Sequence, residues 1–203
     1  MNESPATTPV RKARLRLRSL AILAAAASLF AVVGIPSSAT AAGSVSKKLN
    51  FTQQAQLNSN WCWAATGNSV AAYYGYNYSQ NQFCNMAFGN SLNASCGNYQ
   101  ASLADDQNAF SQIGISTGNY VYTYLYYSSI IREIDAGRPV MARIQWSSGG
   151  GHMEVLYGYD QSQNWVYWGN PWPSSNRYNW ATYSYYVSNS SFSWTHSLDY
   201  IGA

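Results

Sequence analysis

The chain has 203 residues, of which 47% are hydrophobic and only 9% charged; this is long enough for one domain with a sizeable core and short for two. Its formal charge of +3 comes from the first 41 residues, where five of the eleven basic and one of the eight acidic side chains lie. The remainder carries six basic and seven acidic side chains, so no basic surface is left to bind a phosphate backbone. Nucleic acid is therefore not an expected partner.

The N-terminal segment has the three parts of a secretory signal peptide. Basic residues gather over residues 11–18, an apolar run follows over residues 20–35, and the small residues Ala39 and Ala41 stand at the positions that a signal peptidase reads. The apolar run is shorter than the roughly 20 residues that cross a bilayer. We expect residues 1–41 to be removed, leaving a secreted, extracellular protein without stable membrane association. The alternative is an uncleaved membrane anchor.

Residues 42–52 are expected to be a short unstructured lead-in, and residues 53–203 to form one domain whose first half is helical. The Ala-rich residues 61–74 predict a buried helix, for which Ser59 or Asn60 is a competent N-cap. Further helices are predicted over residues 79–88, 103–113 and 128–136.

The second half of the domain favours strands. Aromatic and β-branched residues are frequent there, and turns rich in Gly, Asn and Asp separate them. The predicted strands are residues 120–126, 140–146, 152–159 and 165–168, followed by a last hairpin of residues 178–187 and 192–201. Helices first and strands afterwards indicate an α+β fold.

Three cysteines remain after the leader. Cys84 and Cys96 lie on either side of a Ser- and Asn-rich stretch, and exported cysteines tend to pair, so we expect a loop-closing disulfide between them. Cys62 is then left over, and such a cysteine is either intermolecular or reactive. No CxxC or HExxH spacing is present, so neither a metal nor another cofactor is expected.

Cys62 falls in the first turn of the predicted helix. The partial positive charge and unpaired N–H groups of a helix N-terminus favour a thiolate, which is the nucleophilic form of cysteine. Gln56 lies six residues earlier and could supply a side-chain N–H to an oxyanion, together with the backbone N–H of Cys62. Gln53 and Gln54 are nearby rivals. The alternatives are a buried structural cysteine and a solvated glutamine.

Two histidines are candidates for the base that would activate a nucleophile. His152 follows a Ser- and Gly-rich loop, which would let a substrate chain approach the imidazole, and it opens a predicted strand. His196 lies within the last strand, has no glycine turn beside it, and is expected to be structural. A surface loop histidine is the alternative for His152.

An imidazole that acts as a base needs a partner for its second nitrogen. Asn170 lies at the end of the strand that follows the His152 strand, and a hairpin would bring it back beside the histidine. Neighbouring tryptophans could shield the resulting hydrogen bond. Asp160 is a competing partner at the far end of the His152 strand. An Asn-Pro pair can also simply start a turn.

These residues together resemble the papain-like cysteine peptidases. The ordered set is Gln56, then Trp-Cys-Trp-Ala-Ala around Cys62, then Gly-His at His152, then Asn-Pro-Trp at Asn170. It is most similar to the compact bacterial branch of bacteriocin-processing, staphopain-like and avirulence peptidases, over about residues 53–173. The resemblance implies a nucleophile helix packed on a C-terminal antiparallel sheet. It also implies Cys62 as nucleophile, His152 as base, Asn170 as orienter and Gln56 as oxyanion donor.

Two departures separate the chain from the larger plant and lysosomal members. The first cysteine of their Cys-Gly-Ser-Cys-Trp motif is replaced here by Ser59, and His152 follows Cys62 by only 90 residues. The expected enzyme is a monomeric endopeptidase acting on peptide or protein substrates. Two alternatives stay open: another Cys–His acyl-transfer enzyme (a peptidoglycan amidase or a transglutaminase-like protein), and a non-catalytic binding module whose aromatic tail is its surface.

Overall fold

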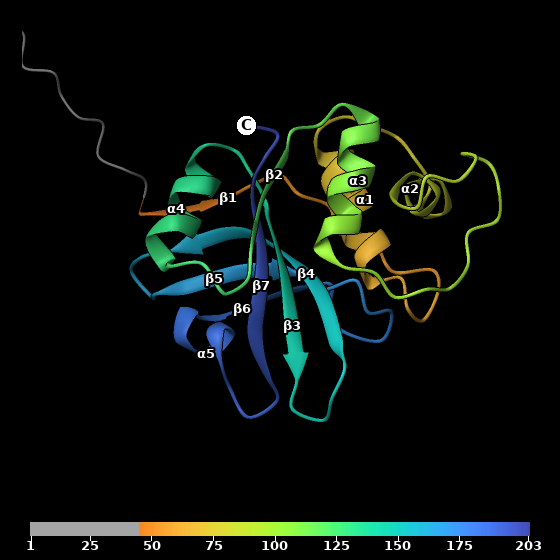
Figure 1. Ribbon diagram of the computed structural model, residues 1–203. Coiled ribbons are helices and arrows are strands. Elements are labelled where there is room, and N and C mark those ends of the chain that lie inside the picture. Colours follow the sequence, from red (N-terminus) through yellow and green to blue (C-terminus); the bar gives the residue numbers. More distant parts are fainter. Residues whose placement is uncertain (1–44) are drawn as a thin grey trace, which may run out of the picture. The chain divides into compact units, whose positions relative to one another are not determined.

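Residues 45–203 are described by the computed structural model, so the leader predicted over residues 1–41 lies outside the described residues. Four helices come where the sequence places them (Figure 1): α1 Cys62–Tyr73, α2 Gln80–Ala87, α3 Leu103–Ile113 and α4 Tyr127–Asp135. No helix in this range is both long and apolar enough to cross a membrane.

Local polar contacts explain where two of these helices begin and end. Ser79 accepts a hydrogen bond from the backbone of Gln82, whose side chain reaches back to the Ser79 N–H, so α2 starts on a capping box. The carboxylate of Asp105 likewise accepts the Ser102 N–H at 2.7 Å before α3. Gly114 ends α3 with φ +86°, a left-handed conformation that glycine adopts without a Cβ penalty.

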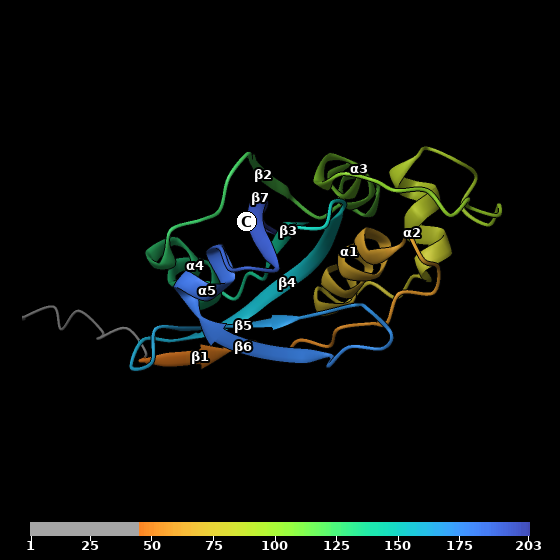
Figure 2. The same cartoon turned by 90° about the horizontal axis from the view of Figure 1, so that it is seen from below.

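Six strands form one antiparallel sheet in the order β2-β7-β3-β4-β5-β6, and β1 pairs with β4 outside this path. They are β2 Thr117–Val121, β3 Val140–Trp146, β4 Gly151–Asp160, β5 Trp165–Gly169, β6 Tyr178–Thr182 and β7 Phe192–Ile201, with β1 at Ser46–Lys48. The first three helices gather beside the β3–β4 part of the sheet, and α4 and α5 lie on its other side (Figure 2). Helices followed by an antiparallel sheet confirm the predicted α+β class.

The lead-in is not wholly unstructured, which corrects the prediction for residues 42–52. Strand β3 pairs with β4 only as far as Leu156, so the last residues of β4 have an open edge. Strand β1 fills this edge, with Lys47 opposite Tyr159. The ammonium of Lys48 then lies 3.7 Å from the centre of the Tyr167 ring, a cation–π contact that holds the segment to the sheet.

The predicted C-terminal hairpin is also wrong. Strand β6 pairs with β5, whereas β7 pairs with β2 and β3, and helix α5 (Tyr183–Val187) connects them. Burial of one ring explains the helix. Tyr186 is fully buried against Trp168 and Trp194, and its hydroxyl donates to Glu154 at 3.0 Å. Burial raises the pKa of Glu154 to about 8, so this carboxyl is protonated at neutral pH.

The strand predicted over residues 120–126 is shifted toward the N-terminus. Gly118 permits the earlier start, because it has φ +71° and a Cβ there would lie 2.1 Å from the carbonyl oxygen of Asp199 on β7. The strand ends at Val121, and Tyr122 and Tyr126 beyond it are largely exposed. Alternating aromatic residues therefore continue past the end of the pairing.

Candidate active site

Cys62 is the first residue of α1, as the sequence predicts, but the cap differs. The N-cap position is held by Trp61, which makes no side-chain capping bond. Ser59 and Asn60 are engaged with Asn98 instead: the Asn60 N–H donates to the Asn98 side-chain oxygen, and the Asn98 amide donates to the Ser59 hydroxyl, each at 2.9 Å. The expected caps therefore fasten the helix start to a distant loop.

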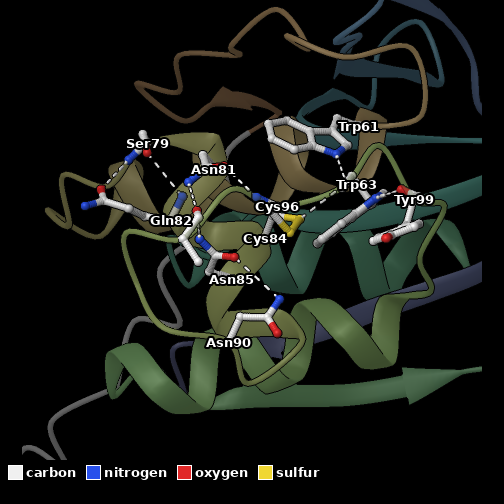
Figure 3. Close-up of a disulfide and its surroundings, with 12 residues drawn as sticks. Trp61, Trp63, Ser79, Asn81, Gln82, Cys84, Asn85, Asn90, Cys96 and Tyr99 are labelled. Carbon is white, nitrogen blue, oxygen red and sulfur yellow. Dashed lines mark hydrogen bonds between the residues drawn. A yellow bond between two sulfur atoms is a disulfide. The ribbon is translucent and has the colours of Figure 1, made fainter.

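The two tryptophans that flank Cys62 fasten the same loop. The indole N–H of Trp61 donates to the Gly97 carbonyl and that of Trp63 to the Tyr99 carbonyl, both at 3.0 Å (Figure 3). The next residues of the loop, Gln100 and Ala101, line a cavity together with Cys62. The Trp-Cys-Trp sequence thus positions one wall of the cavity relative to the thiol.

A disulfide anchors this loop to α2. Cys84 of α2 is bonded to Cys96, which confirms the predicted pairing and leaves Cys62 as the free cysteine of residues 45–203 (Figure 3). The side-chain oxygen of Asn81, also on α2, accepts the Cys96 N–H at 2.9 Å. Helix α2 is therefore the support on which the cavity wall rests.

Removing this disulfide should lower the free energy of unfolding by about 3 kcal/mol, the loop-closure value for a ring of this size. The change is Cys84→Ala with Cys96→Ala, and urea unfolding of both proteins under non-reducing conditions measures it. Because Gln100 and Ala101 lose their anchor, a ligand of this cavity should bind more weakly. Reduction of the parent protein should reproduce both effects. An unchanged midpoint would show that the loop is held by its hydrogen bonds alone.

His152 and Asn170 meet across the predicted hairpin of β4 and β5. His152 Nε2 lies 2.9 Å from Asn170 Oδ1, which also accepts the Trp172 N–H at 2.8 Å. The backbone donor fixes this Asn170 atom as the oxygen, so Nε2 must carry the shared proton. In a neutral imidazole Nδ1 then has the free lone pair and can accept a proton.

Two tryptophan rings enclose the imidazole. Trp146 of β3 stacks at 5.9 Å between ring centres, and Trp172 meets it edge-on at the same separation. His152 is only 3% exposed as a result. The predicted shielding of the Asn–His hydrogen bond is present, with Trp146 as an additional ring that the sequence analysis did not single out.

One cavity brings the thiol and the imidazole together. Cys62 and His152 both line it, along with Trp63, Gly151, Met153 and other residues of α1, the 97–101 loop, β3 and β4. The Met153 N–H, next along the chain from His152, contacts the Cys62 sulfur. The structure thus places a free cysteine at a helix start in the same cavity as a histidine that an asparagine orients.

Comparison with known proteins decides the family. A family model described as "Papain-like cysteine protease AvrRpt2" matches residues 44–190, well over half of the chain. The chain belongs to this family. It is a papain-like cysteine peptidase, and the family implies peptide or protein substrates. No curated protein matches the sequence significantly.

Two solved structures are similar to this chain at low sequence identity. The peptidase domain of Streptococcus ComA, a bifunctional ABC transporter involved in quorum sensing, is 18% identical with a TM-score of 0.57, over 76% of this chain and 97% of that one. Xylellain, a cysteine protease from Xylella fastidiosa, is 14% identical with a TM-score of 0.47, over 78% and 87%. The ComA match confirms the predicted papain-like α+β architecture.

Burial sets the resting charge of the cysteine–histidine pair in this peptidase. It raises the pKa of Cys62 above its ordinary value, although the N–H groups of Met153, Trp63 and Cys62 itself lower it in part. It lowers the pKa of His152 below its ordinary value, and the hydrogen bond to Asn170 offsets this in part. Both shifts favour a neutral thiol beside a neutral imidazole, so the helix start does not by itself hold a thiolate.

Gln56 lies close to the nucleophile helix, but its donors are occupied. Its amide nitrogen donates to the carbonyls of Asn58 and Ser59, each at 2.9 Å, and its own oxygen is buried with no hydrogen-bond partner among residues 45–203. It lines a neighbouring hollow with Trp172. In this conformation the side chain braces the approach to α1. The rival Gln53 is similarly engaged, with the Gln54 carbonyl at 3.1 Å.

The competing candidates lie elsewhere. His196 of β7 packs against the stacked rings of Tyr120 and Tyr122, 5.8 and 5.7 Å away between ring centres, as expected of a structural histidine. Asp160 ends β4 and accepts hydrogen bonds from Ser162 in the adjoining turn. The sequence analysis missed Arg143, which lines the cavity from the middle of β3. Its signal was available: it is a lone cation within a strand of otherwise uncharged residues.

Proposed function

We propose that this peptidase is a secreted endopeptidase in which Cys62 is the nucleophile, His152 the general base and acid, and Asn170 the residue that orients the imidazole. The observation that carries the proposal is the bond from His152 Nε2 to Asn170 Oδ1, because it leaves Nδ1 as proton acceptor in the cavity that Cys62 lines. The free thiol of Cys62 and the family membership support the same assignment.

The proposed reaction begins from the neutral pair. As the sulfur attacks the substrate carbonyl carbon, the thiol proton passes to His152 Nδ1, and a tetrahedral oxyanion forms. The imidazolium then gives this proton to the departing amine, and a thioester with Cys62 remains. Water, deprotonated by His152, hydrolyses the thioester and restores the thiol. Asn170 accepts from Nε2 throughout and stabilises the imidazolium.

The oxyanion needs fixed donors near the Cys62 sulfur. The backbone N–H of Cys62 is one of the unpaired groups of the first helical turn and can serve directly. Gln56 is the second donor in the proposal, six residues before the cysteine. It would have to exchange its bond to the Asn58 or Ser59 carbonyl for one to the oxyanion when substrate enters. Secretion is proposed from the leader pattern of residues 1–41.

The resting charge state predicts the pH profile of kcat/KM. Below the pKa of His152, which burial lowers, the imidazole is protonated and cannot accept the thiol proton, so activity falls with decreasing pH. Above the pKa of Cys62, which burial raises, the thiolate forms without an imidazolium, and the leaving amine receives no proton. The profile should be a plateau between these limits. An alkaline limb near neutral pH would contradict the raised pKa of the Cys62 thiol.

A peptide-library digestion tests the proposed function. The purified protein is incubated with a mixture of peptides of random internal sequence, and mass spectrometry identifies new termini. We expect internal cleavage that Cys62→Ala abolishes. Products formed equally by the variant, or no products at all under any condition from acid to alkaline pH, would contradict an endopeptidase.

A further inference from the structure

The active-site cavity contains one permanently charged side chain among the described residues that line it, and the mechanism above does not use it. Arg143 lies in the middle of β3, a strand whose first residues are buried on both faces, and it reaches the cavity half-buried. Its neighbours across the pairing are Met153 of β4 and His196 of β7. The guanidinium therefore lies on the sheet side of the cavity that Cys62 and His152 also line.

The guanidinium is held in place by neutral acceptors. One terminal nitrogen donates to the Thr195 hydroxyl at 2.8 Å and the other to the Gln145 side-chain oxygen at 2.9 Å. The Thr195 hydroxyl in turn donates to the Arg143 carbonyl at 3.1 Å, which fixes its orientation. Gly151 makes room for the group, because a Cβ at that position would lie 2.6 Å from an Arg143 nitrogen.

No carboxylate of residues 45–203 forms an ion pair with this charge. Within residues 45–203 both ion pairs involve Glu133, with Arg132 and Arg138 as partners. Burial lowers the pKa of His196, and the nearby charge of Arg143 lowers it further. A half-buried guanidinium normally pairs with an anion, and its planar array of five N–H groups matches a carboxylate in a bidentate arrangement. Two N–H groups are bound to neutral acceptors, so others remain for a ligand.

We propose that Arg143 is a specificity-determining residue that binds the side-chain carboxylate of a substrate Asp or Glu close to the scissile bond. This inference rests on the proposed function. Only if Cys62 is the attacking group does the scissile bond lie in the cavity that Arg143 also lines. A substrate carboxylate would complete the ion pair that the protein leaves open. The other lining residues, such as Gln100 and Asn60, carry no permanent charge. Arg143 is therefore the residue whose charge would select an acidic substrate side chain.

Matched peptide pairs test the inference. Starting from one cleaved peptide, each position within three residues of the scissile bond is changed to Glu or Gln in turn, and kcat/KM is measured for each pair. Bonds to charged groups predict that at one position Glu is preferred over Gln by about 10- to 100-fold. Raising the salt concentration should reduce that ratio.

The variants assign the preference to Arg143. In Arg143→Gln the Glu/Gln ratio at that position should fall to about one, and in Arg143→Glu a Lys should be preferred there over Glu. Arg143→Lys keeps the charge but not the fork, so an intermediate ratio is expected. Each ratio compares two substrates of the same protein, so a general loss of activity does not change it. Residual activity in either Arg143→Gln or Arg143→Glu is enough to measure the ratio.

The possible results separate the two proposals. If the parent protein cleaves no peptide, the endopeptidase proposal fails. If it cleaves peptides without a Glu preference, or if Arg143→Gln and Arg143→Glu retain the preference, only the role of Arg143 is overturned. The C-terminal carboxylate of the peptide is the other group that could bind Arg143, and a substrate with an amidated C-terminus tests for it. If amidation abolishes the preference, Arg143 binds the chain terminus and not a side chain, which also overturns the inference.

Discussion

Replacing Cys62 by alanine should abolish peptide hydrolysis, with no measurable turnover on a substrate that the parent protein cleaves. The reason is chemical, because the thioester cannot form and no other free cysteine lies in residues 45–203. The fold should survive, since Cys62 is only partly buried and alanine is an excellent helix former at the start of α1. Steady-state hydrolysis and circular dichroism measure the two effects.

A matched control separates this effect from damage to the disulfide region. The Cys84→Ala, Cys96→Ala protein lacks both other cysteines but keeps Cys62, and it should retain turnover with a raised KM. Substantial activity in folded Cys62→Ala would overturn the assignment of the nucleophile and with it the proposed mechanism.

Replacing His152 by alanine should lower kcat by about a thousandfold or more, because both proton transfers lose their carrier. His196→Ala is the control, since it removes the chain's other histidine from a cluster with Tyr120 and Tyr122, and it should keep most of the turnover. Asn170→Ala should fall between them. The imidazole remains there, but Nε2 loses the acceptor that holds the proton off Nδ1.

The ranking is measured with all three variants on one peptide, with folding checked by circular dichroism. A loss of activity confined to His196→Ala would mean that the wrong base had been chosen. Asn170 would then lose its role too, because its assignment depends on the bond to His152. Asn170→Ala with full activity would show that the tryptophan rings alone orient the imidazole.

Local signals explain what the sequence could predict. The capping residues Ser79 and Ser102 mark the starts of two helices, and a largely apolar run, interrupted by Arg143 and Gln145, marks β3. The hairpin between β4 and β5 needs only two strands that follow each other in the chain with a turn between them, so the meeting of His152 with Asn170 could be predicted from the sequence pattern. The odd number of cysteines, together with the short spacing of Cys84 and Cys96, likewise identified Cys62 as the free thiol.

Long-range contacts explain what the sequence could not predict. The placement of β7 between β2 and β3 depends on packing across the whole sheet, and the burial of Tyr186 turns part of a strand-like pattern into α5. The pKa of Cys62 depends on how deeply the cavity buries the thiol, which a helix position does not reveal. The occupied donors of Gln56 depend on two carbonyls of a loop whose course is set by the fold.

Covalent labelling tests the central claim, that His152 activates Cys62, most directly. The folded protein is treated with a peptidyl acyloxymethyl ketone, which a catalytic thiol displaces irreversibly, and the adduct is located by peptide mapping without reduction. We predict a single adduct on Cys62 that forms rapidly in the parent protein and in His196→Ala, and slowly or not at all in His152→Ala. An adduct on another residue, or equal labelling of Cys62 with and without His152, would contradict it.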